Sequence, residues 1–157
     1  MKDIAVLLHN VRSAYNVGSI FRTADAAGVS KMFLSGYTPR PVDKFGRVQN
    51  DIAKTALGAE KYLQWEYAKS PRAFSRRLKK DGWTIVGVEQ DKRSKNYRSF
   101  RAKGKTLFIF GNEVLGMSKS LRDICDMLVE IPMHGKKESL NVSVTAGIIL
   151  FNAGNRG

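Results

Sequence analysis

Short apolar runs recur along the chain, separated by segments with a different periodicity. Their lengths and their content of branched aliphatic residues are typical of buried β-strands. These runs lie at residues 4–8, 31–34, 84–88, 106–110 and 128–132. The run at 106–110 is almost entirely apolar, as expected of a central strand that a parallel sheet buries on both faces.

Apolar positions at helical spacing fill most of the intervals between these runs. In the first interval they recur from Val17 to Ala27, with Asn16 placed as the N-cap and Gly28 as the stop signal. Pro71 opens a second amphipathic helix. Further helices are predicted at 51–57, 121–128 and 141–151. This order predicts an α/β fold with a mostly parallel sheet and helices on both faces.

The length of 157 residues indicates a single domain, residues 1–157, with no separate RNA-binding domain. Cys125 has no second cysteine to pair with, and adding His9 and His134 still leaves too few ligands for a structural metal, so none is expected. The first apolar run is too short for a secretory or membrane-spanning segment. A cytoplasmic protein that does not enter membranes is therefore expected.

Positive charge is the first compositional feature that points to a partner. The net charge is +13, and residues 69–105 hold thirteen Lys and Arg against three acidic residues. An excess of this size is typical of proteins that bind a polyanion, most often nucleic acid. A solvated charged face and adsorption to a membrane surface are the alternatives. The first normally mixes signs, and the second needs a basic amphipathic helix with exposed large apolar residues, which the sequence does not show.

Three predicted strands run into loops rich in polar residues and glycine, where parallel sheets usually bind ligands. These loops follow the strands at 4–8, 106–110 and 128–132. The first contains Gly18 alone where a dinucleotide fold would need three glycines, and no glycine pair in the chain is followed by the Lys-Ser or Lys-Thr of a phosphate-binding loop. The nucleophile elbow of a serine hydrolase is also absent from the sequence.

The same three loops resemble, in order, the three motifs of the SpoU (TrmH-like) family of knotted RNA ribose methyltransferases. The matching segments are 16–28 (NVGSIFRTADAAG), 110–116 (FGNEVLG) and 131–143, which ends in Ser139-Leu-Asn-Val-Ser143. The resemblance covers nearly the whole chain. It implies the SPOUT (α/β-knot) fold with a trefoil knot near the C-terminus, a homodimer, S-adenosyl-L-methionine as cofactor, and tRNA or rRNA as substrate.

The resemblance also implies catalytic residues. Arg22 stands six residues after Asn16, which is the family's spacing for its catalytic arginine. A guanidinium normally stays protonated, so Arg22 is expected to hold a phosphate and stabilise the developing alkoxide; the family's proposal that it acts as base is the alternative. Glu113, Ser139 and Asn141 complete the implied set. Without the resemblance, Arg22 would be a surface residue, Glu113 a turn carboxylate, and the other three helix caps.

Two further sets follow, one for the cofactor and one for RNA. The residues implied or considered for the cofactor slot are Val88, Gly111, Ile131, Met133, Ser139 and Leu140. The residues considered for phosphate contacts are Arg12, Arg93, Lys95, Arg98 and Arg101. Tyr97 and Phe100, which lie between Lys95 and Arg101 in the sequence, are candidates for stacking on bases. Trp83 is expected in the core. Plain loop arginines and ordinary core residues are the alternatives.

The leading hypothesis is therefore methyl transfer from S-adenosyl-L-methionine to a ribose 2′-hydroxyl of tRNA or rRNA. A non-catalytic RNA-binding or ribosome-assembly protein with the same fold is the alternative from another class. A third possibility keeps the enzyme and moves the methyl group to a base nitrogen. The last helix is short for the family, which places the strength of the dimer in question.

Overall fold

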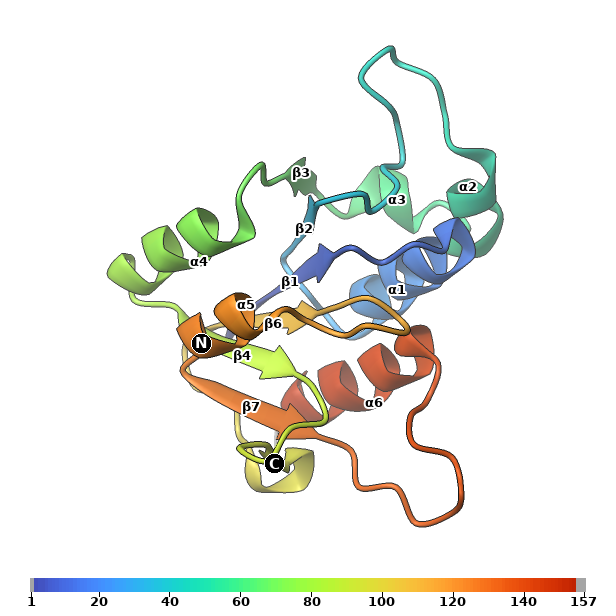
Figure 1. The fold of residues 1–157 in the computed structure, drawn as a ribbon. Coiled ribbons are helices and arrows are strands. Elements are labelled where there is room, and N and C mark those ends of the chain that lie inside the picture. The colour runs from blue at the N-terminus through green and yellow to red at the C-terminus, as the bar shows by residue number, and fades with distance from the viewer. Residues whose placement is uncertain (1, 155–157) are drawn as a thin grey trace.

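A parallel sheet forms the centre of the computed structural model, which describes residues 2–154 (Figure 1). Within those residues it has seven strands in the order β3-β2-β1-β6-β4-β7-β5, and every neighbouring pair is parallel. The strands are β1 (Asp3–His9), β2 (Lys31–Ser35), β3 (Trp65–Tyr67), β4 (Thr84–Val88), β5 (Lys95–Asn96), β6 (Lys105–Phe110) and β7 (Met127–Glu130). The apolar runs at β1 and β6 lie at the middle of the sheet, where both faces are covered.

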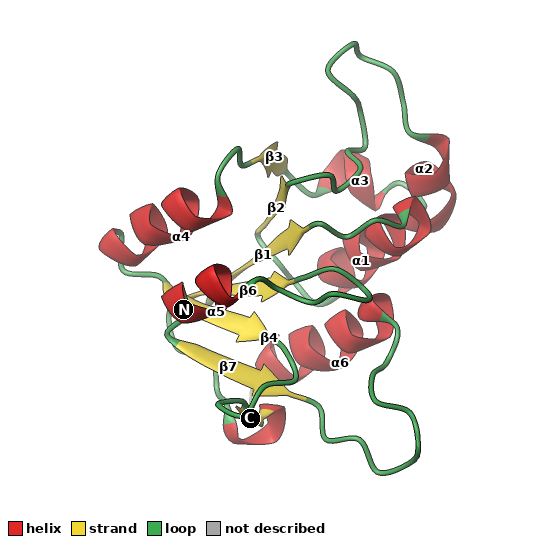
Figure 2. Cartoon of the chain, in the orientation of Figure 1, coloured by secondary structure: helices red, strands yellow, loops and turns green. Residues whose placement is uncertain are grey.

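Helices cover both faces of this sheet, as Figure 2 shows. Alternate strand residues point to opposite faces, so Val6 and Leu8 belong to one core cluster and Ala5 and Leu7 to the other. The first face carries α1 (Ala14–Ala26), α2 (Asn50–Ala56), α3 (Ala59–Tyr62), the short helix η1 (Tyr97–Ser99) and α6 (Val142–Gly154). The second carries α4 (Pro71–Lys80) and α5 (Lys119–Ile124). The predicted α/β fold is confirmed.

Several local predictions need correction. Ser13, and not Asn16, caps α1, because its side chain accepts from the backbone N–H of Asn16. The helix predicted at 121–128 ends at Ile124, since β7 has already begun at Met127. The elements α3, β3, β5 and η1 were not predicted; they are two to four residues long and too short to show a periodicity.

Residues 89–104 wrap around strand β7. Arg93 and Asp91 form ion pairs with α5, which places the first part of this segment on the second face. The chain then pairs at the sheet edge as β5 and returns over the first face, where Phe100 and Ala102 pack in the core with Phe108. Strand β7, which comes later in the sequence, therefore passes through a loop made by earlier residues. Periodicity carries no information on such threading.

Residues 36–49, between β2 and α2, project away from the sheet (Figure 1). Helix α2, which follows them, packs closely on α1: a Cβ at Gly18 would lie 2.0 Å from Thr55 Oγ1. The Thr55 hydroxyl also donates to the carbonyl of Tyr15 at 2.8 Å. Among residues 2–154, no helix combines the length and apolar content that crossing a membrane requires.

Candidate functional site

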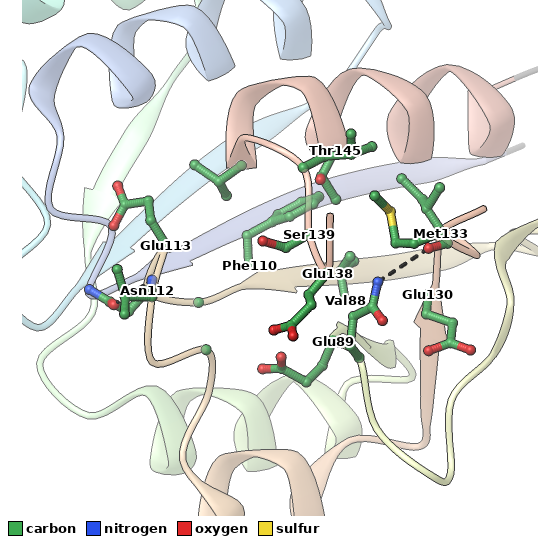
Figure 3. Close-up of a pocket in the computed structure, with 17 residues that line it drawn as sticks. Val88, Glu89, Phe110, Asn112, Glu113, Glu130, Met133, Glu138, Ser139 and Thr145 are labelled. Carbon is green, nitrogen blue, oxygen red and sulfur yellow. Dashed lines mark hydrogen bonds between the residues drawn. The ribbon is translucent and has the colours of Figure 1, made fainter. Parts of the chain in front are cut away.

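A cavity of about 440 Å³ lies where β4, β6 and β7 end, beside the start of α6 (Figure 3). The three strands end at one edge because they are parallel, which is why residues far apart in the sequence meet there. In Figure 3, Asn112 and Glu113 lie at one end of this first cavity, and Glu130 and Met133 lie at the other. Its size is within the range of small-molecule sites.

All six residues that the sequence predicted for the cofactor line the first cavity: Val88, Gly111, Ile131, Met133, Ser139 and Leu140. The loop after β6 is tightly folded there, because a Cβ at Gly111 would lie 2.8 Å from the backbone of Gly116 and Met117. Gly116 adopts a φ of +66°, which favours glycine. The glycines of the second motif therefore allow the two ends of this loop to approach each other closely.

Carboxylates at the cavity were not predicted, apart from Glu113. Glu89, Glu130 and Glu138 also line it, in a protein of net charge +13. Glu89 Oε2 accepts from the backbone N–H of Met117 at 2.7 Å, which ties the end of β4 to the loop after β6. The position of Glu89, directly after a predicted parallel strand, was the signal available in the sequence.

Glu113 connects the loop after β6 to the beginning of α1. Its carboxylate accepts from the backbone N–H groups of Arg12 and Ser13, each at 3.1 Å, and from Asn16 Nδ2 at 3.4 Å. Partial burial acts to raise the pKa of Glu113, but these hydrogen bonds outweigh it and hold the pKa below its usual value. Glu113 is therefore a fixed anion between two motifs.

The third motif joins the same network through Asn141. Asn141 Nδ2 donates to Asn16 Oδ1 at 3.3 Å, and Asn141 Oδ1 accepts from the backbone N–H of Ser143 at 2.8 Å. Ser139 lines the first cavity two residues earlier. The structure thus brings together Asn16, Glu113 and Asn141, with Ser139 beside them, from three separate parts of the sequence.

A second cavity of about 710 Å³ adjoins the first and shares Asn112, Glu113 and Val114 with it. Asn16, Tyr37 and the predicted RNA contact Arg12 also line this second cavity. Asn112 Nδ2 donates to the Tyr37 hydroxyl at 2.9 Å and to the carbonyl of Asn10 at 3.0 Å. Tyr37 was not predicted, because its segment has no regular pattern.

Arg22 lies apart from both cavities. Its side chain is exposed on α1, and it lines neither of them. Within the described part of the chain, its guanidinium has no hydrogen bond or ion pair. The structure therefore groups four of the five predicted catalytic residues and leaves Arg22 outside the group.

The other predicted RNA contacts lie at the far edge of the sheet, on β5 and around η1. Arg93 pairs with Asp91 and Asp123, Arg98 packs on Tyr97, and Arg101 donates to the carbonyls of Arg98 and Phe100. Lys95 is exposed on β5.

The rings that were predicted to stack on bases are half-buried. Tyr97 and Phe100 pack against the core, and Phe100 lies edge-to-face on Phe108 with centroids 5.8 Å apart. Stacking of these two rings on bases stays a prediction, and their packing leaves less of each ring exposed for it. Trp83, predicted in the core, is partly buried and packs against the cluster on the second face. Across residues 2–154, no three His, Cys, Asp or Glu side chains group as metal ligands.

Comparison with known proteins was made on sequence and on structure. Residues 3–151 match the model of the SpoU rRNA Methylase family. The tRNA (guanosine(18)-2′-O)-methyltransferase of Aquifex aeolicus is 34% identical over 152 residues, which are 97% of this chain and 69% of that protein. The 23S rRNA (guanosine-2′-O-)-methyltransferase RlmB of Neisseria meningitidis is 33% identical over 147 residues, 94% of this chain and 56% of that one. The chain thus spans little more than half the length of the second relative.

The fold is also that of solved members. The crystal structure of an AdoMet-bound rRNA methyltransferase from Sinorhizobium meliloti superposes with a TM-score of 0.86 at 29% identity, covering 96% of this chain and 55% of that one. This likeness, with the threading of β7, confirms the predicted SPOUT knot fold. By its family match, by its relatives and by its fold, the chain belongs to the SpoU rRNA methylase family.

Proposed function

We propose that this chain transfers a methyl group from S-adenosyl-L-methionine to the 2′-hydroxyl of a ribose in tRNA or rRNA. The observation that carries the proposal is the pair of adjoining cavities joined at Asn112, Glu113 and Val114. The first is suited to the cofactor and the second to the nucleotide that receives the methyl group. One relative is named for 2′-O-methylation of tRNA and the other for that of 23S rRNA, which supports the two substrate classes.

The residues of the first cavity fit the cofactor in chemistry as well as in size. Apolar side chains, among them Val88, Ile131 and Leu140, offer a dry slot for an adenine ring. Glu89, Glu130 and Glu138 place negative charge near a ligand that carries a sulfonium and an ammonium group. When bound, the cofactor supplies an electrophilic methyl group, whose bond to sulfur breaks as its bond to the ribose oxygen forms.

The chain's own residues position the nucleotide and the loops around it. Glu113 fixes the turn at Arg12 and Ser13 and the amide of Asn16, so the beginning of α1 and the loop after β6 move as one unit. Asn141 extends this unit to α6. Such a rigid arrangement of hydrogen bonds lowers the reorganisation needed to align a weak nucleophile with the methyl group. The Arg12 side chain, exposed at the second cavity, binds the phosphate of the incoming nucleotide.

Arg22 acts in this scheme from a second copy of the chain. Arg22 lines neither cavity of its own chain, and its guanidinium is unpaired among the described residues; both observations support an action in trans. Exposed apolar side chains on neighbouring α6, Val144 and Phe151, offer a dimer contact beside it. In the dimer, the Arg22 guanidinium holds a phosphate and stabilises the negative charge that develops on the ribose oxygen as the hydroxyl gives up its proton to water.

The reaction is tested by supplying methyl-labelled S-adenosyl-L-methionine and unmodified tRNA or rRNA, followed by alkaline hydrolysis of the RNA. A ribose methyl group blocks cleavage at its own phosphodiester, so label in an alkali-resistant dinucleotide is the expected result. Label in mononucleotides would show that the methyl group is on a base and not on the ribose. Cofactor binding without transfer to either RNA would contradict the two substrate classes, and RNA binding without cofactor binding would favour a non-catalytic RNA-binding protein.

The action of Arg22 in trans has its own test. Arg22→Ala is expected to lower the rate about 100–1000-fold, and Glu113→Gln is expected to lower it by weakening the hydrogen bonds that hold Arg12, Ser13 and Asn16. The two variants are mixed and allowed to exchange subunits. If Arg22 serves the partner's cavity, the mixed dimer contains one complete site and its rate exceeds that of either variant alone. If Arg22 serves its own cavity, no complete site forms and the mixture is no faster than the variants measured separately.

A further inference from the structure

Residues 37–49, which we call the β2–α2 arm, hold an exposed aromatic ring between two cations. Phe45 at the tip of the arm is 70% exposed. Lys44 Nζ lies 5.2 Å from the centroid of its ring and the Arg47 guanidinium carbon 5.0 Å. A large apolar side chain left in water contributes nothing to the folded core. Its place between two positive charges matches the make-up of sites that bind single-stranded nucleic acid.

The fold holds the tip of the arm in a defined conformation. Asp43 Oδ1 accepts from the backbone N–H groups of Phe45 and Arg47 at 2.8 and 3.0 Å, and Asp43 Oδ2 pairs with Arg47 Nε at 2.8 Å. Gly46 adopts a φ of +78°, and an antiparallel bridge joins Val42 to Val48 below the turn. The ring of Phe45 is thus presented by an ordered turn, which lowers the entropy cost of binding.

The arm is continuous with the proposed active site. A third cavity, of about 360 Å³, is lined by Arg40, Lys44 and Arg47 and by Tyr37, which also lines the second cavity. Tyr37 is in turn hydrogen-bonded to Asn112, which lines the first and second cavities. Neighbouring cavities in this series of three therefore share lining residues, from the carboxylates at the cofactor end to the cations of the arm.

Lys44 and Phe45 are not used by the fold. In the part of the chain that the structure describes, the Lys44 ammonium has no carboxylate within ion-pair distance, and its one recorded contact is the ring of Phe45. Arg40, by contrast, is stacked on Tyr67 at 3.7 Å and belongs to the base of the arm. The free ring and the free cation are thus adjacent and face solvent at the end of the cavity series.

From these observations we propose that the β2–α2 arm binds the RNA strand that flanks the target nucleotide. Phe45 stacks on an unpaired base and Lys44 contacts a neighbouring phosphate, while Arg47 stays paired with Asp43 and supports the ring. This inference rests on the proposed function for the position of the target nucleotide. It adds a substrate-binding element outside the three family motifs and gives the enzyme a preference for unpaired nucleotides beside its target.

The test uses the full chain with variants Phe45→Ala and Lys44→Ala. Lys61→Ala and Tyr62→Ala are the matched controls, because they form a second exposed lysine-aromatic pair, on α3, that lines none of the three cavities of the series. The probes are unmodified tRNA and rRNA transcripts, and affinity is measured by fluorescence anisotropy over a range of salt concentrations. Cofactor affinity is measured separately by calorimetry.

Phe45→Ala is expected to weaken RNA binding about ten-fold, the typical effect of losing one stacked base. Lys44→Ala is expected to reduce the slope of log affinity against log salt by about 0.7, the value for one phosphate contact on a single strand. Melting temperatures and cofactor affinity stay unchanged, and both control variants bind RNA as the wild type does. The inference is overturned if Phe45→Ala binds RNA like Tyr62→Ala, or if it changes only the oligomeric state.

Failure of this inference and failure of the proposed function give different results. Methyl transfer by the wild type, with normal RNA binding by both arm variants, would contradict RNA binding by the arm and support the proposed reaction. Weakened RNA binding by the arm variants, with no methyl transfer by the wild type to either RNA, would support RNA binding by the arm and contradict the proposed reaction. Absence of RNA binding by the wild type would overturn both.

Discussion

Residues 93–101 and the β2–α2 arm both combine basic and aromatic residues, and the fold uses them in opposite ways. In the first segment, Arg93 is held by two carboxylates, and Phe100 packs in the core. In the arm, Phe45 faces water and Lys44 contacts only that ring. The sequence alone favours 93–101 as the RNA surface because its charge is the more concentrated, whereas the structure favours the arm.

The difference teaches that charge density in a sequence does not locate a nucleic-acid surface. An arginine whose donors are occupied by carboxylates must give up those ion pairs to bind a phosphate, and this loss offsets the gain. Residues 93–101 belong to the wrap around β7, where Arg93 pairs with α5 and the rings of Tyr97 and Phe100 pack against the core of the first face, so these side chains also hold the wrap in place. We expect cations without partners in the fold to dominate RNA recognition.

Arg22→Ala is the strongest test of that expectation, because Arg22 has no partner among residues 2–154 and is proposed to act at the reacting oxygen. Loss of electrostatic stabilisation at a developing oxyanion typically lowers the rate by about 100–1000-fold. We expect a single-turnover rate lower by that factor, with an unchanged melting temperature and unchanged cofactor affinity. Arg76→Ala, at an exposed position of α4, is the control and should transfer normally. A normal rate for Arg22→Ala would remove it from the mechanism.

Gly18→Ala tests how far the arm depends on its anchor. The added Cβ would lie 2.0 Å from Thr55 Oγ1 and 2.4 Å from the carbonyl oxygen of Ile52, so α2 must move away from α1. Overpacking of this kind typically costs about 1–3 kcal/mol of stability, and the melting temperature should fall by about 2–4 °C for each kcal/mol.

The control for Gly18→Ala is Gly147→Ala, in the middle of α6. There the new Cβ would meet only Thr23 Cγ2, at the ordinary contact distance of 3.6 Å. Alanine is the better helix former, so this variant should be neutral or more stable. If Gly18→Ala melts at the temperature of the wild type, the close contact between α1 and α2, the helix that follows the arm, does not contribute to stability as expected.

Much of the fold could be predicted from the sequence, because the strands at the centre of the sheet are long apolar runs. The runs at 4–8 and 106–110 appear as β1 and β6, paired side by side. The wrap around β7 could not be predicted in the same way. It depends on which face residues 89–104 cross, and this is decided by ion pairs and core contacts that join distant positions.

The candidate site likewise contains residues that could be predicted from the sequence and residues that could not. The residues for the cofactor slot were named through the family resemblance, and all six line one cavity because the strands that precede them end at one edge of a parallel sheet. Asn16 was predicted both as a helix cap and as a member of the catalytic set; Ser13 is the cap, and the Asn16 side chain joins Glu113 to Asn141. Tyr37 and Phe45 were missed because they lie in a segment without periodicity, where only three-dimensional contacts mark a residue as exposed or as part of a cavity.

Asp91→Asn tests the other half of the comparison, which is whether the ion pairs of residues 89–104 stabilise the fold and not the complex with RNA. Asp91 lies at the start of the wrap, where it pairs with Arg93 and lies 3.2 Å from Arg122 Nε. Hydrogen bonds from Arg93 are the main cause that lowers the pKa of Asp91. We expect a lower melting temperature with unchanged RNA affinity, because these arginines serve the fold. Asp51→Asn removes a looser exposed pair with Lys54 and should leave both quantities unchanged. Weaker RNA binding by Asp91→Asn at an unchanged melting temperature would contradict the comparison.

Glu113→Gln carries the smallest expected effect on stability and extends the comparison to anions. Partial burial acts to raise the pKa of Glu113, and hydrogen bonds from Arg12, Ser13 and Asn16 hold it below the usual value of 4.5. Because the folded pKa is the lower one, the ionised form stabilises the fold above about pH 4.5, and this contribution is lost as the pH falls through the folded pKa. The midpoint of urea unfolding should therefore be higher for the wild type than for Glu113→Gln at neutral pH. That difference should shrink in acid, and a difference independent of pH would mean that the ionised carboxylate does not hold α1 to the loop after β6.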